Sequence, residues 1–155
     1  LHKGLASSAF DDDGVATVAR NVVENGVVQG YFLGSYSARK LGMRTTGNAG
    51  GTHNLIMQNA APLDFDALLK KMGKGLLVTE LLGHGVNAVT GDYSRGASGY
   101  WVENGEIAYP VEEITIAGNL QEIFQGISAI GNDVVVHGSK QCGSVLIDHM
   151  TVAGG

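Results

Sequence analysis

Residues 75–120 read GLLVTELLGHGVNAVTGDYSRGASGYWVENGEIAYPVEEITIAGNL. Two apolar stretches flank a polar, glycine-rich centre that runs from Thr90 to Gly99. Apolar runs bounded by glycine-containing turns predict β-strands joined by tight connections. The centre carries Asp92, Tyr93, Ser94 and Arg95 at the point where a sheet would turn, and site residues are expected at such a place.

Two interpretations of these four residues remain open. They can form a polar cluster that holds a peptide carboxylate or a peptide backbone. Alternatively they form a structural turn, in which Asp92 accepts local amide bonds and Arg95 pairs with a carboxylate such as Glu103 or Glu106.

Further strands are expected on both sides of this stretch. The Asn-Gly pair at Asn25 and Gly26 predicts a hairpin between Val15–Val23 and Val27–Leu33. The same tetrapeptide, Val-Glu-Asn-Gly, recurs at Val102–Gly105, either through duplication or because it makes a good hairpin turn. The other predicted strands are Leu76–Leu82, Ala88–Tyr93, Ala97–Val102, Glu106–Tyr109, Ile114–Ala117, Val134–His137 and Ser144–Ile147.

Helices are fewer. Asp64 is a capping residue for a helix that ends before Gly73. Asn119 predicts the start of a second helix, whose apolar stripe extends to Ile127. Residues Ser37–Leu41 predict one short helical turn.

These elements predict an α+β domain dominated by β-strands. We expect an antiparallel barrel-like or layered sheet with two or three short helices, in a single domain over residues 1–155. Residues Gly47–Ala61, with their Gly50-Gly51 pair, are expected to form an exposed loop.

Composition excludes several classes of function. A formal net charge of −5 opposes the neutralisation of phosphates on which nucleic-acid binding depends. No apolar run approaches the roughly 18 residues that a membrane helix needs. The sequence has one cysteine, Cys142, which cannot form an internal disulfide, so a reducing cytoplasm is the expected compartment.

Few residues are candidates for catalysis or ligand binding. His84 lies between two glycines and is a weak catalytic candidate, as is Arg95. The surrounding Gly83–Ala88 segment matches a dinucleotide-binding pattern, but Thr90 to Asp92 would stop the helix that this fold requires. His53 follows the Gly50-Gly51 pair in the expected loop, where it can approach a ligand. Taken alone, Cys142 is expected to be a small buried hydrophobic residue.

Ordered motifs lie at residues 9–15, 22–27, 35–42, 90–96, 114–120, 131–133 and 150–154. Together they resemble the C-terminal domain of the PmbA/TldD family, whose members are sometimes labelled modulators of DNA gyrase. The similarity covers essentially the whole chain. Residues 92–99 and 141–146 resemble the PmbA (TldE) branch more than the TldD branch.

The resemblance implies a division of labour between two subunits. In the family, the TldD-type subunit holds zinc on a His-Glu-x-x-x-His helix upstream of this domain, with a cysteine of the C-terminal domain as a further ligand. Cys142 lies at the position of that cysteine, but this sequence has no such histidine motif. We therefore expect no metal in this chain and zinc on a TldD-like partner.

The function implied by the resemblance is that of a fragment of a longer PmbA-like subunit. Such a subunit belongs to a cytoplasmic metalloprotease of peptide maturation and proteolysis, in a homo- or hetero-oligomer. The fragment alone is expected to be inactive and to contribute subunit interface and peptide-channel surface. Asp92 to Arg95 are the expected substrate or interface residues. The alternative is a non-catalytic binding or regulatory scaffold module.

Overall fold

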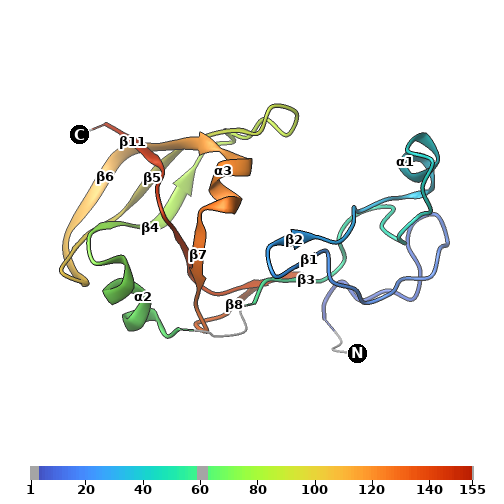
Figure 1. Ribbon diagram of the computed structural model, residues 1–155, viewed down its shortest axis with the longest axis horizontal. Helices are drawn as coiled ribbons and strands as arrows, with labels where there is room; N and C mark the ends of the chain where they lie inside the picture. The colour runs from blue at the N-terminus through green and yellow to red at the C-terminus, as the bar shows by residue number, and fades with distance from the viewer. Residues whose placement is uncertain (1–3, 59–62, 155) are drawn as a thin grey trace. The chain divides into compact units, whose positions relative to one another are not determined.

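The computed structural model describes residues 4–58 and 63–154. The chain forms two compact units, whose residues can be located in Figure 1 from the colour bar. Unit 1 contains Leu1–Met57 and Val135–Gln141, and unit 2 contains Gln58–Val134 and Cys142–Gly155. The expectation of a single domain over residues 1–155 stays a prediction, because one domain can contain two such units.

An antiparallel four-stranded sheet forms the body of unit 2, in the order β11-β6-β5-β4. Its two central strands form a long curved hairpin (Figure 1). Asn104 and Gly105 close this hairpin with φ angles of 54° and 76°, as a primed two-residue turn requires. The strands are β4 (Gly75–Leu82), β5 (Asp92–Glu103), β6 (Glu106–Asn119) and β11 (Thr151–Ala153).

The core of unit 2 lies on one face of this sheet. Ala97, Ile114 and Ile116 are buried at its centre. Complete burial of a side chain as large as isoleucine contributes about 1.5–3 kcal/mol, so the apolar face of these strands stabilises the sheet. The partly buried hydrophobic residues that pack against this centre are Leu76, Val78, Tyr93, Val111 and Met150.

Helix α2 (Phe65–Met72) confirms the capping prediction. The Asp64 carboxylate accepts a hydrogen bond of 2.7 Å from the amide of Ala67, and Gly73 ends the helix with a φ of 67°. Leu68 and Leu69 are buried, as the amphipathic pattern requires.

Helix α3 (Leu120–Gln125) is shorter than the sequence pattern indicated. Asn119 caps it by accepting a bond of 3.0 Å from the amide of Gln121, and the helix ends at Gly126. The prediction that Ile127 continues the apolar stripe of this helix was wrong. Ile127 begins strand β7 (Ile127–Ile130), which pairs with β10 (Val145–Ile147), so strand pairing ends the helix.

Unit 1 has short regular elements. Its hairpin β1 (Val23–Glu24) and β2 (Val27–Val28) turns at Asn25 and Gly26 as predicted. Strands β3 (Leu55–Ile56), β9 (Lys140–Cys142) and β8 (Val135–His137) form a three-stranded sheet in that order. Helix α1 (Ser35–Lys40) begins two residues earlier than expected, because the Asp13 carboxylate accepts a bond of 2.8 Å from the amide of Ser35.

Several further strand predictions were wrong in extent. Residues 88–90 form a turn, because the Asn87 side chain accepts bonds of 3.0 and 3.2 Å from the amides of Val89 and Thr90. Of the ranges Val15–Val23 and Val27–Leu33, the structure places only Val23 and Val27–Val28 in strands. The two strands expected between Glu106 and Ala117 are one continuous strand, β6.

The expected exposed loop at Gly47–Ala61 is partly packed. Gly47 is buried, and a side chain there would lie 2.8 Å from the carbonyl of Ala16. The segment also contains β3, while its residues 59–61 lie outside the described residues. Close packing against Ala16, which is distant in sequence, is the reason for the difference.

The predicted fold class is confirmed. Strands predominate and form several separate sheets, and three short helices accompany them in the part of the chain that the structure describes. Within residues 4–58 and 63–154 no closed barrel is found. In the same ranges no helix is long and apolar enough to cross a lipid bilayer.

Candidate functional site

The four residues Asp92 to Arg95 lie at the start of β5 and not in a turn. Successive side chains of a strand point to opposite faces. Asp92 and Ser94 are exposed, whereas Tyr93 and Arg95 are half-buried, and Tyr93 packs against the core. The sheet therefore divides the expected polar cluster between its two faces.

Each of these side chains has a local role in the structure. The Asp92 carboxylate accepts a bond of 2.6 Å from the Thr90 hydroxyl. The Nη2 group of Arg95 donates to the carbonyl of Leu81 at 3.3 Å, and its buried Nε has no acceptor among the described residues. Leu81 belongs to the edge strand β4, so Arg95 links the start of β5 to that edge.

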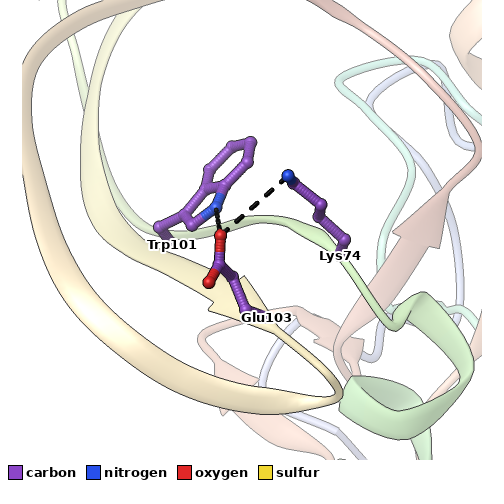
Figure 2. A network of polar contacts seen from close by, with 3 residues as sticks. All are labelled: Lys74, Trp101 and Glu103. Carbon is purple, nitrogen blue, oxygen red and sulfur yellow. Dashed lines mark hydrogen bonds and ion pairs between the residues drawn. The ribbon is translucent and has the colours of Figure 1, made fainter.

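The expected ion pair between Arg95 and Glu103 or Glu106 is not formed. Glu103 and Glu106 lie opposite each other at the far end of the hairpin, about 26 Å along β5 from Arg95 at 3.3 Å per residue. Glu103 instead accepts a bond of 3.2 Å from Trp101 Nε1 and lies 3.9 Å from Lys74 Nζ (Figure 2). Lys74 also lies 5.9 Å from the centre of the Trp101 ring, so these three side chains form a separate surface network.

His84 is exposed in the connection between β4 and β5. The neighbouring carbonyl of Gly85 accepts a bond of 2.7 Å from the amide of Ser94, and Val86 forms a bridge with Tyr93. A side chain at position 85 would lie 1.4 Å from the carbonyl of Ser94, so only glycine permits this approach. The structure thus brings the backbone around His84 to Tyr93 and Ser94, which sequence spacing did not indicate.

Cys142 lies in unit 2, where the segment around Gly143 packs closely against the segment around Gly131. Its Sγ atom donates to the carbonyl of Gly143 at 3.1 Å, and the residue is half-buried. Both oxygens of the Asp133 carboxylate bind Ser144, at 3.0 Å from its amide and 2.6 Å from its hydroxyl. A side chain at Gly143 would lie 2.2 Å from the carbonyl of Gly131, so glycine is required there.

The chemistry of this junction does not make a metal site by itself. Burial raises the pKa of the Cys142 thiol, and the nearby charge of Asp133 raises it further. A zinc ligand is the deprotonated thiolate, so this environment opposes binding through Cys142 alone. Within the described ranges no group of three or more His, Cys, Asp or Glu side chains is arranged to hold a metal ion.

The pKa of the Asp133 carboxyl group is shifted in the opposite direction, below its ordinary value. Partial burial alone would raise the pKa of its carboxyl group, but the hydrogen bonds from Ser144 outweigh this effect and hold that pKa below its ordinary value. No sequence pattern indicated a role for Asp133 or Ser144. They are separated by eleven positions, so no local pattern indicates that they meet.

Unit 1 contains its own polar centre around the buried carboxylate of Asp11, which is 4% exposed. It accepts bonds of 3.0, 2.9 and 2.9 Å from the amides of Asp13, Val15 and Ala49. Desolvation would raise its pKa, but these bonds and the charge of His53 lower it below the ordinary value. The amide of Asp13 is two residues from Asp11 and that of Ala49 is 38 residues away, so the carboxylate connects segments that are distant in sequence.

His53 is held beside this centre. Its Nε2 atom lies 2.9 Å from the carbonyl of Gly47, and its backbone has a φ of 54°. It lines a shallow hollow of ≈ 380 Å³ in unit 1, together with Ser8, Asp12 and Lys140. His53 thus lies at the edge of this hollow, where its ring contacts the Gly47 carbonyl.

Comparison with known proteins decides the family. The model of the PmbA/TldA metallopeptidase C-terminal domain matches residues 1–154. The chain belongs to this family. It is similar to metalloprotease PmbA of Escherichia coli O157:H7, with 55% identity over 99% of the chain and 34% of that protein. The PmbA homolog of Haemophilus influenzae is 53% identical over the same shares.

The solved structures agree in fold. A Thermotoga maritima protein described as a candidate modulator of a DNA gyrase superposes with a TM-score of 0.88 at 43% identity, over 97% of this chain and 36% of that one. TldE from Thermococcus kodakarensis gives a TM-score of 0.80 at 25% identity, over 95% and 36%. A TldD homolog of Haemophilus influenzae is 28% identical, so the PmbA relatives named above are the more similar in sequence. The chain spans about a third of the length of the curated relatives it matches, 34% in both PmbA cases.

Proposed function

We propose that this chain is the C-terminal domain of a PmbA-like subunit in a cytoplasmic TldD/TldE-type metalloprotease assembly that acts in peptide maturation and proteolysis. The domain contributes subunit interface and peptide-channel surface. Zinc would be held by the TldD-like partner, where it would activate the water that performs the hydrolysis. The observation that carries this proposal is the family match over residues 1–154, together with a lone Cys142 whose surroundings favour the neutral thiol.

The edge of the unit 2 sheet is suited to an extended peptide. Strand β4 is the outer strand of the sheet, and its residues Thr79–Leu82 are exposed. An exposed edge can add a peptide as a further strand, and its backbone bonds do not depend on the peptide's side chains. This mode of binding fits a protease that acts on unfolded peptides of varied sequence.

The predicted segment Asp92 to Arg95 begins strand β5, which pairs with β4 farther along its length. Arg95 bonds to Leu81 in β4, and the connection carrying His84 begins directly after this strand. On the solvent side of β5, Asp92 and Ser94 are exposed. We assign Asp92 and Ser94 to contact with a partner or peptide, with Tyr93 and Arg95 supporting them from the other face.

A matched pair of substitutions tests this assignment. In the full-length protein, Ser94→Arg places a long cation on the proposed surface, whereas Ala108→Arg places the same side chain at an exposed position near the hairpin turn. We expect Ser94→Arg to weaken binding of a TldD-like partner by at least about tenfold, because a misplaced charge at an interface is costly. Equal effects of the two variants in a calorimetric titration would contradict the assignment.

Metal analysis of the full-length protein alone distinguishes the alternatives. A subunit or scaffold is expected to contain no stoichiometric zinc and to show no peptidase activity without a partner. Zinc and activity in the isolated protein would instead indicate a self-sufficient enzyme. A scaffold differs from a subunit in that it binds other proteins without changing the peptidase activity of a TldD-like partner.

A further inference from the structure

The tetrapeptide Val-Glu-Asn-Gly forms two nearly identical turns in this chain. The first is Val23–Gly26 and the second is Val102–Gly105. The φ angles are 50° and 77° at Asn25 and Gly26, and 54° and 76° at Asn104 and Gly105. Sequence and local backbone geometry are therefore matched, and any difference in chemical behaviour must come from the surroundings.

An Asn-Gly pair can undergo spontaneous cyclisation. The backbone nitrogen of glycine attacks the side-chain carbonyl carbon of asparagine, a new C–N bond forms, and ammonia leaves with the transferred proton. Water then opens the resulting succinimide at either carbonyl and yields aspartate or isoaspartate. The reaction requires the turn to open, so that the glycine nitrogen can reach the asparagine side chain.

The first turn has little to keep it closed. Strands β1 and β2 contain two residues each, and all of them are exposed. They form a separate two-stranded sheet, and such a hairpin is marginally stable by itself in water. A Cβ atom placed on Gly26 would meet no atom within 4 Å, so the tip of this hairpin is open to solvent.

The second turn is held by long strands and by a helix. It joins β5 and β6, which contain 12 and 14 residues. The amide of Gly105 donates to the carbonyl of Gly73 at 2.8 Å, directly after α2, and this engages the nitrogen that would react. Gly105 is buried, and a Cβ atom there would lie 2.8 Å from Cα of Lys70. Opening this turn requires its separation from α2.

We propose that Asn25 is a site of spontaneous deamidation and that the identical sequence at Asn104 is protected by the packing of Gly105 against α2. The inference does not depend on the proposed function. Local opening has a small free-energy cost at short exposed elements and a large one in packed strands, and the rates follow this difference. Each event at Asn25 adds one negative charge to a chain whose net charge is −5.

Peptide mapping by mass spectrometry tests the proposal directly. The full-length protein is incubated in mildly alkaline buffer, and the fraction of aspartate plus isoaspartate is followed at both positions. We expect conversion at Asn25 to be at least about tenfold faster than at Asn104. In concentrated urea, where neither turn persists, the two positions should convert at similar rates. Similar rates in the native protein, or no conversion at Asn25 on the timescale seen in urea, would overturn the proposal.

Two variants test whether the contact between Gly105 and α2 is what protects Asn104 from deamidation. Asn25→Gln should abolish the charge change at the first turn and leave the rate at Asn104 unchanged. Asp64→Ala removes the cap of α2 and should accelerate conversion at Asn104 severalfold without affecting Asn25. An unchanged rate at Asn104 in the Asp64→Ala variant would contradict protection by the α2 contact.

Discussion

A single buried carboxylate, Asp11, organises much of the non-repetitive backbone of unit 1. Its two oxygens accept three amide hydrogen bonds, and neighbouring Asp13 binds the amide of Ser35 at the start of α1. Backbone amides that are not part of a helix or sheet need acceptors, and carboxylates supply strong ones. At this scale, acidic residues replace the hydrogen bonding that regular secondary structure provides elsewhere.

The first prediction concerns the pH dependence of this carboxylate. Its pKa is lower in the folded chain than the value of about 3.9 expected when unfolded. The charged form therefore stabilises the fold above the unfolded pKa, and that contribution is lost as the pH falls through the folded pKa. Asp11→Asn should lower the free energy of unfolding near neutral pH and reduce its decline in acid.

Denaturant unfolding of both forms over an acidic pH series measures this effect. Asp12→Asn is the control, because Asp12 is exposed and its carboxylate accepts none of these three amide bonds. Identical pH dependence in Asp11→Asn and the unmodified protein would refute the assigned role.

A second prediction at the residue scale concerns Gly85. Because a Cβ atom there would lie 1.4 Å from the Ser94 carbonyl, Gly85→Ala must displace the segment that carries His84 from β5. We expect a loss of about 1–3 kcal/mol in stability from this overpacking. In the unmodified protein the Ser94 amide donates a hydrogen bond to the carbonyl of Gly85, so hydrogen exchange should show that this amide exchanges faster in the variant.

Gly83→Ala provides a contrasting change in the same connection. Gly83 has open space around it but a φ of 77°, so its substitution strains the backbone without a collision. Unchanged protection of the Ser94 amide in Gly85→Ala would show that the close approach is not needed.

At the scale of elements, α2 shows the clearest agreement between local sequence and structure. A cap, an apolar stripe and a closing glycine all fall within ten consecutive residues, from Asp64 to Gly73. The helix also supports the turn at Gly105, so its ends matter for the hairpin of unit 2.

The third prediction is that Asp64→Ala destabilises unit 2 by about 1 kcal/mol, the usual cost of losing a side-chain cap. Asp66→Ala, at an exposed position in the first turn of the same helix, should have a smaller effect because Asp66 makes no cap bond. Thermal unfolding of the two variants gives the comparison. A larger loss in Asp66→Ala would contradict the assignment of the cap.

Elements with local signals could be predicted from the sequence, and elements that depend on distant partners could not. Both Asn-Gly turns and the α2 cap were recognised because a few neighbouring residues determine them. Strands β3 and β9 pair in parallel although they lie far apart in sequence, and no local pattern marked them. The turn at residues 88–90 was missed because the Asn87 side chain outweighs the strand preference of Val89 and Thr90.

The local geometry of the candidate segment could be predicted only in part from the sequence, for the same reason. The segment from Asp92 to Arg95 was selected for its polarity, but strand alternation places its side chains on two faces. Its link to β4 through Leu81 and to the His84 connection through Gly85 arises from tertiary contacts. The roles of Asp11, Asp133 and Ser144 likewise depend on contacts between distant segments.

For the whole molecule, the family assignment and the chemistry lead to the same proposal. The chain covers about a third of its PmbA relatives, 34% in each of the two cases, and its cysteine environment favours a neutral thiol. Under this proposal, the domain supplies surface and the partner activates water. The proposed division of labour therefore places hydrolysis in the partner and peptide contact in the edge of the unit 2 sheet.

The most direct test is the peptidase activity of a purified TldD-like partner, measured on an unfolded peptide while the full-length parent of this chain is added in increasing amounts. The proposal predicts that activity rises to saturation at a fixed ratio of subunits and that all zinc remains with the TldD-like protein. The Ser94→Arg variant should require a higher concentration to reach the same activity. Activity that is unchanged by the parent protein, with no complex formed, would contradict the proposed function.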